Sequence, residues 1–235
     1  DGVDLADCLF EFQNGKWKYA IINADTVSYT DMWKQRLGEA SKLNALDFVL
    51  LHKEYGVLLS EYVSEFLAKY HIKPDFVASH GHTIFHRPEK ELTCQIGDGA
   101  VMAARLNVPV VCDFRTVDVA LKGQGAPLVP IGDELLFSEY FFRLNLGGIA
   151  NISYSENGKT VAFDICPFNM ALNYLSNQLG YEFDDGGILA SQGVINHELL
   201  THLSSLAFFK AVPPKSLGRE WFDNVFQPIL DSYNI

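Results

Sequence analysis

The stretch FFRLNLGGIANISYSENGKTVAFDICPFN, residues 141–169, decides the fold. It predicts three strands, at Phe142–Leu146, Ile149–Tyr154 and Thr160–Ile165. The first two are joined at Gly147-Gly148 and the last two at Asn157-Gly158, a hairpin turn signal because both residues tolerate positive φ. We expect the last strand to end at a carboxylate, Asp164, and to give way to a helix. The two glycines allow a backbone to approach a charged group, on which such a carboxylate can act.

A second Asn-Gly hairpin lies near the start of the chain. Val3–Phe12 and Lys16–Val27 are apolar, β-rich runs that Asn14-Gly15 separates. Strand, Asn-Gly-Lys turn and strand therefore occur twice, and this repeat is weak by identity but clear by pattern. The chain begins at Asp1-Gly2, without a methionine and directly before a strand, so we expect it to be part of a longer polypeptide.

The region between the two hairpins alternates helices with short apolar strands. Leu46–Tyr70 carries a sustained helical stripe of apolar residues, and Pro74 follows its end. Further elements are expected at Phe76–Ser79, Thr93–Ile96, Ala100–Leu106, Val108–Cys112, Asn169–Leu179, Val194–Leu206 and Glu220–Asp231. The alternation indicates an α/β fold with parallel strands. An internal boundary is expected near Pro130–Glu139, which divides the chain into domains at 1–133 and 134–235.

Composition excludes several classes of protein. Apolar residues make up 48% and charged residues 20% of the 235 residues, as in ordinary globular proteins. The net charge of −11 argues against a nucleic-acid partner or an anionic membrane surface. No apolar run is long enough for a membrane span, and the N-terminus lacks the basic region of a signal peptide. The four cysteines show no CxxC spacing, which favours reduced thiols and a cytoplasmic location.

Polar or glycine-rich clusters repeatedly follow the apolar strands. They lie at Ser79–Thr83, Gly97–Gly99, Asp113–Arg115, Gly147-Gly148 and Asp164. In α/β sheets the carboxyl ends of strands form the ligand crevice. Each cluster alone is better explained as an ordinary turn, but five of them together favour a binding site.

Each candidate residue has a structural alternative. Asp164 is either a general base or the N-cap of the next helix. Arg115 either clamps an anion or forms a structural pair with Asp113. Lys215-Ser216 with Arg219 caps the last helix or faces an anion. His80, His82 and His86 form an HxHxxxH pattern, but no cysteine or carboxylate completes a metal set, so we expect hydrogen-bonding histidines and no protein metal site.

Several collinear motifs together carry a family resemblance. They are DGVD (1–4), SHGHTIFH (79–86), QIGDG (95–99), PVVCDFRTVDVA (109–120), GQGAPLVP (123–130), LNLGGIANIS (144–153), AFD (162–164) and PPKSLGRE (213–220). This set resembles the anhydro-N-acetylmuramic acid kinases across essentially the whole chain. The resemblance implies the superfamily of sugar kinases, actin and heat-shock ATPases. It therefore implies two actin-like (ribonuclease H-like) domains around a central cleft, the first lacking its first strand and the second its C-terminal part.

The resemblance also implies an activity and a set of site residues. The family uses ATP and Mg²⁺ to open the 1,6-anhydro ring of anhydro-N-acetylmuramic acid with water, and it phosphorylates the freed O6 in cell-wall recycling. Asp164 matches the aspartate that deprotonates the water. Phosphate contacts fall on Asp1, Gly2, Val3, Asp4, Gly147 and Gly148. Sugar contacts fall on His80, Gln95, Asp113, Arg115 and Asn169. A homodimer through the helices of residues 194–232 is a further possibility.

The sequence also departs from the family pattern. The Gly-Thr-Ser that precedes the first Asp-Gly is absent, and Cys166 and Phe168 replace two small residues after Asp164. These changes support one alternative, an anhydrosugar-binding relative without phosphoryl transfer. A glycoside-type hydrolase is a second alternative, but the sequence offers no clear second carboxylate beside Asp164. A structural actin-like filament protein is a remote third.

Overall fold

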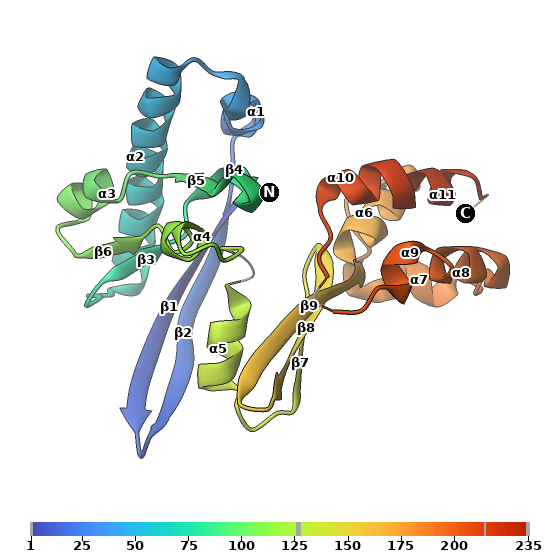
Figure 1. Cartoon of the computed structure of the whole chain (residues 1–235). Helices are drawn as coiled ribbons and strands as arrows, with labels where there is room; N and C mark the ends of the chain where they lie inside the picture. The colour runs from blue at the N-terminus through green and yellow to red at the C-terminus, as the bar shows by residue number, and fades with distance from the viewer. Residues whose placement is uncertain (1, 126–127, 214, 234–235) are drawn as a thin grey trace. The chain divides into compact units, whose positions relative to one another are not determined.

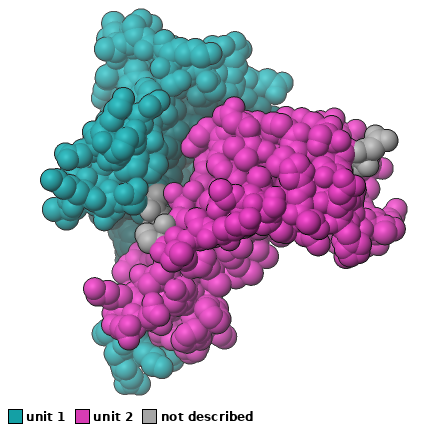
Figure 2. Space-filling model, turned by 45° about the vertical axis from the view of Figure 1, so that its right-hand side comes forward, with its two compact units in different colours: residues 1–128 teal, residues 129–235 magenta. Residues whose placement is uncertain are grey.

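The computed structural model describes residues 2–125, 128–213 and 215–233 (Figure 1). The chain divides into two compact units, residues 1–128 and residues 129–235, shown in teal and magenta in Figure 2. Both units combine helices with strands, which confirms the mixed α/β class. The boundary expected between residues 133 and 134 falls within α5 (Val129–Leu136).

Unit 1 begins with a long antiparallel hairpin. Strand β1 (Gly2–Gln13) pairs with β2 (Lys16–Ser28) along almost its whole length. The turn between them has φ values of +53° at Asn14 and +77° at Gly15. These are the conformations that Asn-Gly turns favour, so the predicted hairpin is confirmed.

The core of unit 1 is built on one long helix. Helix α2 (Ala45–Tyr70) begins where the Asn44 side chain accepts a hydrogen bond from Asp47 N–H, and it ends at His71 in the left-handed region. This confirms the helix predicted at Leu46–Tyr70. The apolar stripe of α2 packs with α1 (Asp31–Glu39) and with Ile96 and Met102. A 3-10 turn at Ala40–Lys42 connects the two helices.

The rest of unit 1 consists of short strands and helices around α2. Strand β3 (Val77–Ser79) pairs in parallel with β6 (Val110–Cys112), and β4 (His82–Arg87) pairs antiparallel with β5 (Leu92–Ile96). Helices α3 (Gly99–Leu106) and α4 (Thr116–Ala120) and the 3-10 turn Pro88–Lys90 complete it. The cluster predicted at Ser79–Thr83 is therefore only partly a loop, because β4 already begins at His82.

The sheet of unit 2 contains the stretch that decides the fold. Strands β7 (Phe142–Leu146), β8 (Ile149–Glu156) and β9 (Lys159–Pro167) form a three-stranded antiparallel sheet in sequence order. The register between β8 and β9 shifts at Ala150/Asn151, which marks a bulge. The three predicted strands are confirmed, but β9 continues to Pro167, two residues beyond the predicted end at Ile165.

Helices form the second half of unit 2. They are α6 (Asn169–Gln178), α7 (Ile188–Gln192), α8 (His197–Ser204), α9 (Ala207–Lys210), α10 (Arg219–Trp221) and α11 (Gln227–Asp231), with a 3-10 turn at Asp185–Gly187. Phe222, Phe226 and Leu230 form their buried centre. The helix predicted from Val194 begins at His197, because Asn196 is its N-cap. The last predicted helix is interrupted by a π turn at Phe222–Phe226.

No helix in the described ranges has both the length and the apolar character needed to cross a membrane.

Candidate functional site

Asp164 lies inside a strand and not at its end, which corrects the prediction. It is the sixth residue of β9, and three residues of the strand follow it. The alternative that Asp164 caps the next helix is also wrong, since Phe168 is the N-cap of α6 and makes no side-chain cap bond. The carboxylate is therefore free of a capping role and belongs to the polar face of the sheet.

A segment distant in the sequence hydrogen-bonds to Asp164 along the outer edge of β9, the side that no other described strand of this sheet occupies. We call residues 215–217 the strap. Asp164 N–H donates to Lys215 O over 3.0 Å, and Leu217 N–H donates to Asp164 Oδ2 over 2.7 Å. Partial burial raises the pKa of Asp164, and the Leu217 hydrogen bond opposes that rise. No role for Leu217 is predicted from the sequence, because its contact with Asp164 depends on tertiary folding.

On the side of β9 away from the strap, the two neighbouring strands carry a row of two carboxamides beside Asp164. Asn151 pairs with Asp164 across β8 and β9, and Asn145 pairs with Asn151 across β7 and β8. Directly opposite residues of an antiparallel pair share one face and have Cβ atoms about 4.5–5.5 Å apart. The bulge beside Asn151 sets this register, and bulges re-aim side chains next to functional sites. Two neutral amides therefore accompany the carboxylate.

Helix α5 covers the same face of the sheet, next to Asn151 and Asp164 along strands β8 and β9. Asp133 accepts a hydrogen bond from Ser153 Oγ at 2.6 Å, and Glu134 accepts one from Thr160 Oγ1 at 2.9 Å. Beneath it Arg143 is only 7% exposed, whereas its neighbour Phe142 is 59% exposed. The covered face is therefore polar.

The Gly147-Gly148 turn is tied to the start of α6. Its two carbonyls accept hydrogen bonds from the N–H groups of Phe168, Asn169 and Met170 at 2.9–3.2 Å. Within the described residues, the N–H groups of the two glycines themselves donate no hydrogen bond. A Cβ added at Gly148 would meet nothing within 4 Å. Free N–H groups beside open space suit a phosphate group.

The residues after Asp164 support this turn. Asn169 Nδ2 donates to Leu146 O over 3.1 Å, so at least part of this amide serves the fold. Cys166 pairs with Ala150 in the ladder, and burial raises the pKa of its thiol. Phe168 takes part through its backbone, which donates to Gly148 O.

In unit 1 the structure brings together residues from three motifs. Arg115 Nε donates to His80 Nε2 over 2.9 Å, and Arg115 Nη1 donates to Gly125 O over 2.7 Å. Because His80 Nε2 accepts, the ring proton is on Nδ1, which donates to Gly81 O over 3.0 Å. The carboxylate of Asp118 accepts from Gly125 N–H. Both ring nitrogens of His80 thus have a partner, and the side chain is held in one orientation.

The predicted structural pair between Asp113 and Arg115 is wrong. Asp113 accepts a hydrogen bond from Thr116 Oγ1, and its φ of +59° places it in a tight turn after β6. Arg115 is instead directed towards His80 and Gly125. Burial lowers the pKa of Arg115 from its ordinary value.

Gln95 lies on β5 in the same unit. Its Nε2 donates to Thr93 Oγ1 over 2.8 Å and to Thr83 Oγ1 over 3.3 Å. Its Oε1 is buried and has no hydrogen-bond partner among the described residues. A buried acceptor without a donor is costly, so this oxygen is a good position for a ligand hydroxyl or amide.

The other two histidines of the HxHxxxH pattern lie on β4. The ring of His82 packs edge-on against Tyr55, and burial followed by the nearby His80 lowers its pKa. His86 Nδ1 is 3.2 Å from Thr93 Oγ1, and burial lowers its pKa too. Across the described ranges, no group of three or more His, Cys, Asp or Glu side chains is placed to hold a metal ion.

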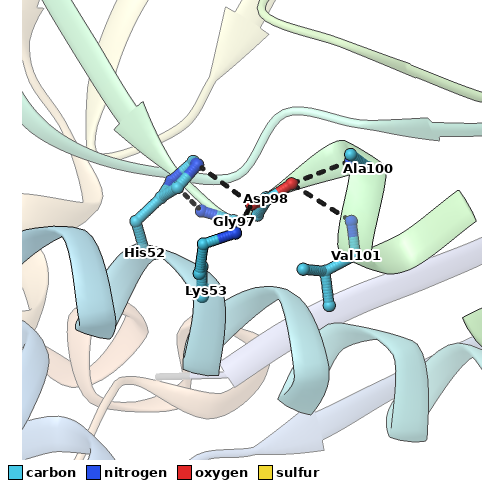
Figure 3. A network of polar contacts seen from close by, with 6 residues as sticks. All are labelled: His52, Lys53, Gly97, Asp98, Ala100 and Val101. Carbon is cyan, nitrogen blue, oxygen red and sulfur yellow. Dashed lines mark hydrogen bonds and ion pairs between the residues drawn. The ribbon is translucent and has the colours of Figure 1, made fainter. Parts of the chain in front are cut away.

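The QIGDG motif is fixed to α2 by a polar network (Figure 3). Asp98 caps α3 by accepting from the N–H groups of Ala100 and Val101, and its other oxygen pairs with Lys53 Nζ at 3.1 Å. Gly97 N–H donates to His52 Nδ1. Partial burial raises the pKa of Asp98, but the hydrogen bonds from Val101, Lys53 and Ala100 outweigh that effect and lower it. Asp98 thus anchors the loop that follows Gln95.

The remaining predicted residues lie at the start of the chain and near its end. Gly2, Val3 and Asp4 are in β1, where Asp4 Oδ1 accepts from Thr26 Oγ1 over 2.7 Å; Asp1 lies outside the described residues. Neither Lys215 nor Arg219 caps the last helix, because the N-cap of α10 is Gly218, without a side-chain bond.

A mixed α/β fold that joins a glycine turn with free N–H groups to a carboxylate on the next hairpin is typical of proteins that bind phosphate groups. The sequence matches the family described as anhydro-N-acetylmuramic acid kinase over residues 1–231. The chain therefore belongs to the anhydro-N-acetylmuramic acid kinase family.

Curated relatives with that name agree with this assignment. The chain is 40% identical to a protein of Rhodopseudomonas palustris over 96% of this chain and 66% of that protein. It is 38% identical to a protein of Zymomonas mobilis over 94% and 66%, respectively. For a Bacillus cereus protein the identity is 34% over 96% and 64%. The chain thus spans about two thirds of the length of these relatives.

Proposed function

We propose that the protein carrying this chain is an ATP-dependent anhydrosugar kinase. It hydrolyses the 1,6-anhydro ring of anhydro-N-acetylmuramic acid and phosphorylates O6, which gives N-acetylmuramic acid 6-phosphate. The observation that carries the proposal is the half-buried Asp164. Its pKa is raised, and its Oδ1 accepts no hydrogen bond from the described residues, which suits a general base. The family membership supports the substrate.

The proposed reaction assigns one proton transfer to this chain. Asp164 takes a proton from water as the water oxygen bonds to C1 of the sugar and the C1–O6 bond breaks. The freed O6 bonds to the γ-phosphorus of ATP, and ADP leaves. Such a transfer needs positioning and charge stabilisation more than covalent chemistry from the protein.

The glycine turn and the first strand are the proposed phosphate contacts. The free N–H groups of Gly147 and Gly148 suit phosphate oxygens, and Asp1, Gly2, Val3 and Asp4 are the second proposed contact. Mg²⁺, when bound with ATP, neutralises phosphate charge, and it is commonly held mainly by phosphates and water. Coordination by phosphates and water is compatible with the described ranges, in which no metal-ligating cluster is found.

The proposed sugar contacts lie in unit 1, apart from Asn169. Arg115 uses Nε and Nη1 for His80 and Gly125, and no hydrogen bond from Nη2 is found in the described part of the chain, so Nη2 is available for a carboxylate such as the lactyl group. Gln95 Oε1 is available as an acceptor. Asp113 follows β6 in the same motif as Arg115.

We further propose that the two units are actin-like domains of a cytoplasmic enzyme. The repeated Asn-Gly hairpin supports this, because each unit contains one, at Asn14-Gly15 and at Asn157-Gly158. A homodimer through the helices of residues 194–232 remains part of the proposal.

Phosphate transfer from labelled ATP to 1,6-anhydro-N-acetylmuramic acid tests the function. The full-length protein, the 235-residue chain and full-length Asp164→Asn are assayed side by side, with binding of the sugar measured separately. We expect product from the full-length protein and none from Asp164→Asn, which still binds the sugar. Sugar binding without product from the full-length protein would overturn the kinase and identify an anhydrosugar receptor.

A further inference from the structure

Asp164 is held by a segment that ends 53 positions further along the chain, at Leu217. The strap, residues 215–217, makes two backbone hydrogen bonds with it, one to the main chain and one to the carboxylate. The carboxylate bond uses Oδ2 alone. Among the described residues no hydrogen bond to Oδ1 is found. The two oxygens of the Asp164 carboxylate therefore differ in their hydrogen bonding, because the strap donates to Oδ2 and not to Oδ1.

The strap is itself attached to the fold at a further point. Lys215 Nζ donates to Phe208 O over 3.1 Å and lies 4.6 Å from the centre of the Phe208 ring. The same ammonium lies 6.0 Å from the centre of the Phe163 ring, on the residue before Asp164. The strap thus connects α9 to β9, and Lys215 gives it an attachment besides its two hydrogen bonds with Asp164.

We propose that the strap is a positioning element for the general base. Leu217 N–H fixes Oδ2 and so presents Oδ1 as the oxygen that accepts the proton from water. The inference rests on the proposed function for its chemical meaning, but the hydrogen bond acts on Asp164 whether or not the protein transfers phosphate. Side-chain identity at position 217 is not needed, because the donor is the backbone.

A positioning role and a merely structural role give different results when the N–H is removed. A hydrogen bond to the ionised carboxylate favours ionisation, so its loss raises the pKa of Asp164. A strap that only joins α9 to β9 would change stability and leave the titration of Asp164 unchanged. Burial and the Leu217 bond are the influences on this carboxyl. Lys215, the cation of the strap, lies 6.0 Å from the ring centre of the neighbouring Phe163.

The test replaces the Leu217 amide by an ester in the full-length protein, through incorporation of the α-hydroxy analogue of leucine. This removes one hydrogen-bond donor and keeps the side chain. Leu217→Ala is the matched control, because it shortens the side chain and keeps the N–H. The titration of Asp164 is followed by NMR of aspartate labelled with ¹³C at the carboxyl carbon, with Asp164→Asn for assignment.

We expect the ester to titrate at higher pH than the wild type, and Leu217→Ala to titrate like the wild type. The acid limb of kcat/KM for phosphate transfer should move in the same direction, with a loss of about tenfold on that limb. An Asp164 titration unchanged by the ester would overturn the proposal. If the wild type transfers no phosphate, the proposed function fails, and the NMR titration still decides the role of the strap.

Discussion

At the scale of single residues, the proposed role of Asp164 as a general base conflicts with its contribution to stability. Its pKa in the folded protein is raised by burial, so ionisation is less favourable in the folded than in the unfolded chain. The contribution of this carboxyl to stability is therefore full below the unfolded pKa of about 3.9 and is lost as the pH rises through the folded value. At pH 7 the charge lowers the free energy of unfolding.

Asp164→Asn should therefore melt at a higher temperature than the wild type at pH 7, although it lacks the proposed general base. The neutral amide keeps an oxygen that can accept from Leu217 N–H and removes the buried charge. Thermal unfolding at pH 7 and near pH 4 measures this, and the difference should shrink at the lower pH. A variant that melts below the wild type at pH 7 would show that the charge of Asp164 is stabilising.

Asn151→Asp should move the acid limb of the activity profile to higher pH. A second carboxylate directly opposite Asp164 disfavours its ionisation, so activity at pH 7 should fall and recover as the pH rises. Asn145→Asp is the matched control, because it adds the same charge one strand further away and should give a smaller displacement. Equal displacements in the pH dependence of kcat/KM for the two variants would contradict the arrangement in which Asn151 lies next to Asp164 and Asn145 lies one strand further away.

Residue types could be predicted from the sequence, but partners could not. The sequence singled out Asp164, Arg115 and His80. It paired Arg115 with its neighbour Asp113, whereas the fold turns Asp113 to Thr116 and brings His80, 35 positions away, to Arg115. The contact of Leu217 with Asp164 is equally invisible in the sequence, since a backbone N–H has no residue signal.

At the scale of elements, local chemistry decided most of what could be predicted. The Asn-Gly turns and the stripe of α2 depend on neighbours in the sequence, and both are confirmed. The extension of β9 beyond Asp164 depends on the bulge and on the strap, which are tertiary features. The π turn in the last helix, at Phe222–Phe226, also depends on packing, because two of its residues form the centre of the unit 2 core.

Asp98→Ala should lower the free energy of unfolding by about 1–2 kcal/mol through loss of the α3 cap. The Asp98 carboxylate is partly buried, with 14% of its side chain exposed, and it also pairs with Lys53. Asp98→Asn is the matched control, because it keeps a cap oxygen and loses only the charge. Urea unfolding at pH 7 should rank the wild type first, then Asn, then Ala.

The same carboxylate gives a pH dependence of opposite sign to that of Asp164. The pKa of Asp98 is lowered in the folded protein, so its contribution is present above the unfolded pKa of about 3.9 and is lost as the pH falls through the folded value. The stability difference between the wild type and Asp98→Asn should therefore disappear in acid. A difference that persists there would assign it to geometry and not to charge.

At the scale of the whole molecule, each unit has its own buried cluster. The unit 1 cluster is centred on α2 and the unit 2 cluster on the last helices, and the two have no residue in common. Leu51, 1% exposed, and Phe222, 2% exposed, are representative of them. Separate cores favour separate unfolding of the two units.

Leu51→Ala should therefore destabilise unit 1 by about 2–5 kcal/mol and leave hydrogen exchange in unit 2 unchanged. Phe222→Ala is the reciprocal variant, with faster exchange expected in unit 2 only. Peptide-resolved hydrogen exchange of the full-length protein measures both. Faster exchange in both units after either substitution would show one cooperative fold.

The attachment of the glycine turn to α6 has a mechanical consequence. Three N–H groups at the start of the helix end on the two carbonyls of Gly147 and Gly148, and the Asn169 side chain holds the strand just before them. Hydrogen bonds thus join the glycine turn directly to the N-terminus of α6. If the phosphate group of the proposed function displaces the turn when it binds, these hydrogen bonds should transmit the displacement to the start of α6, and the helix should carry it to its far end at Gln178.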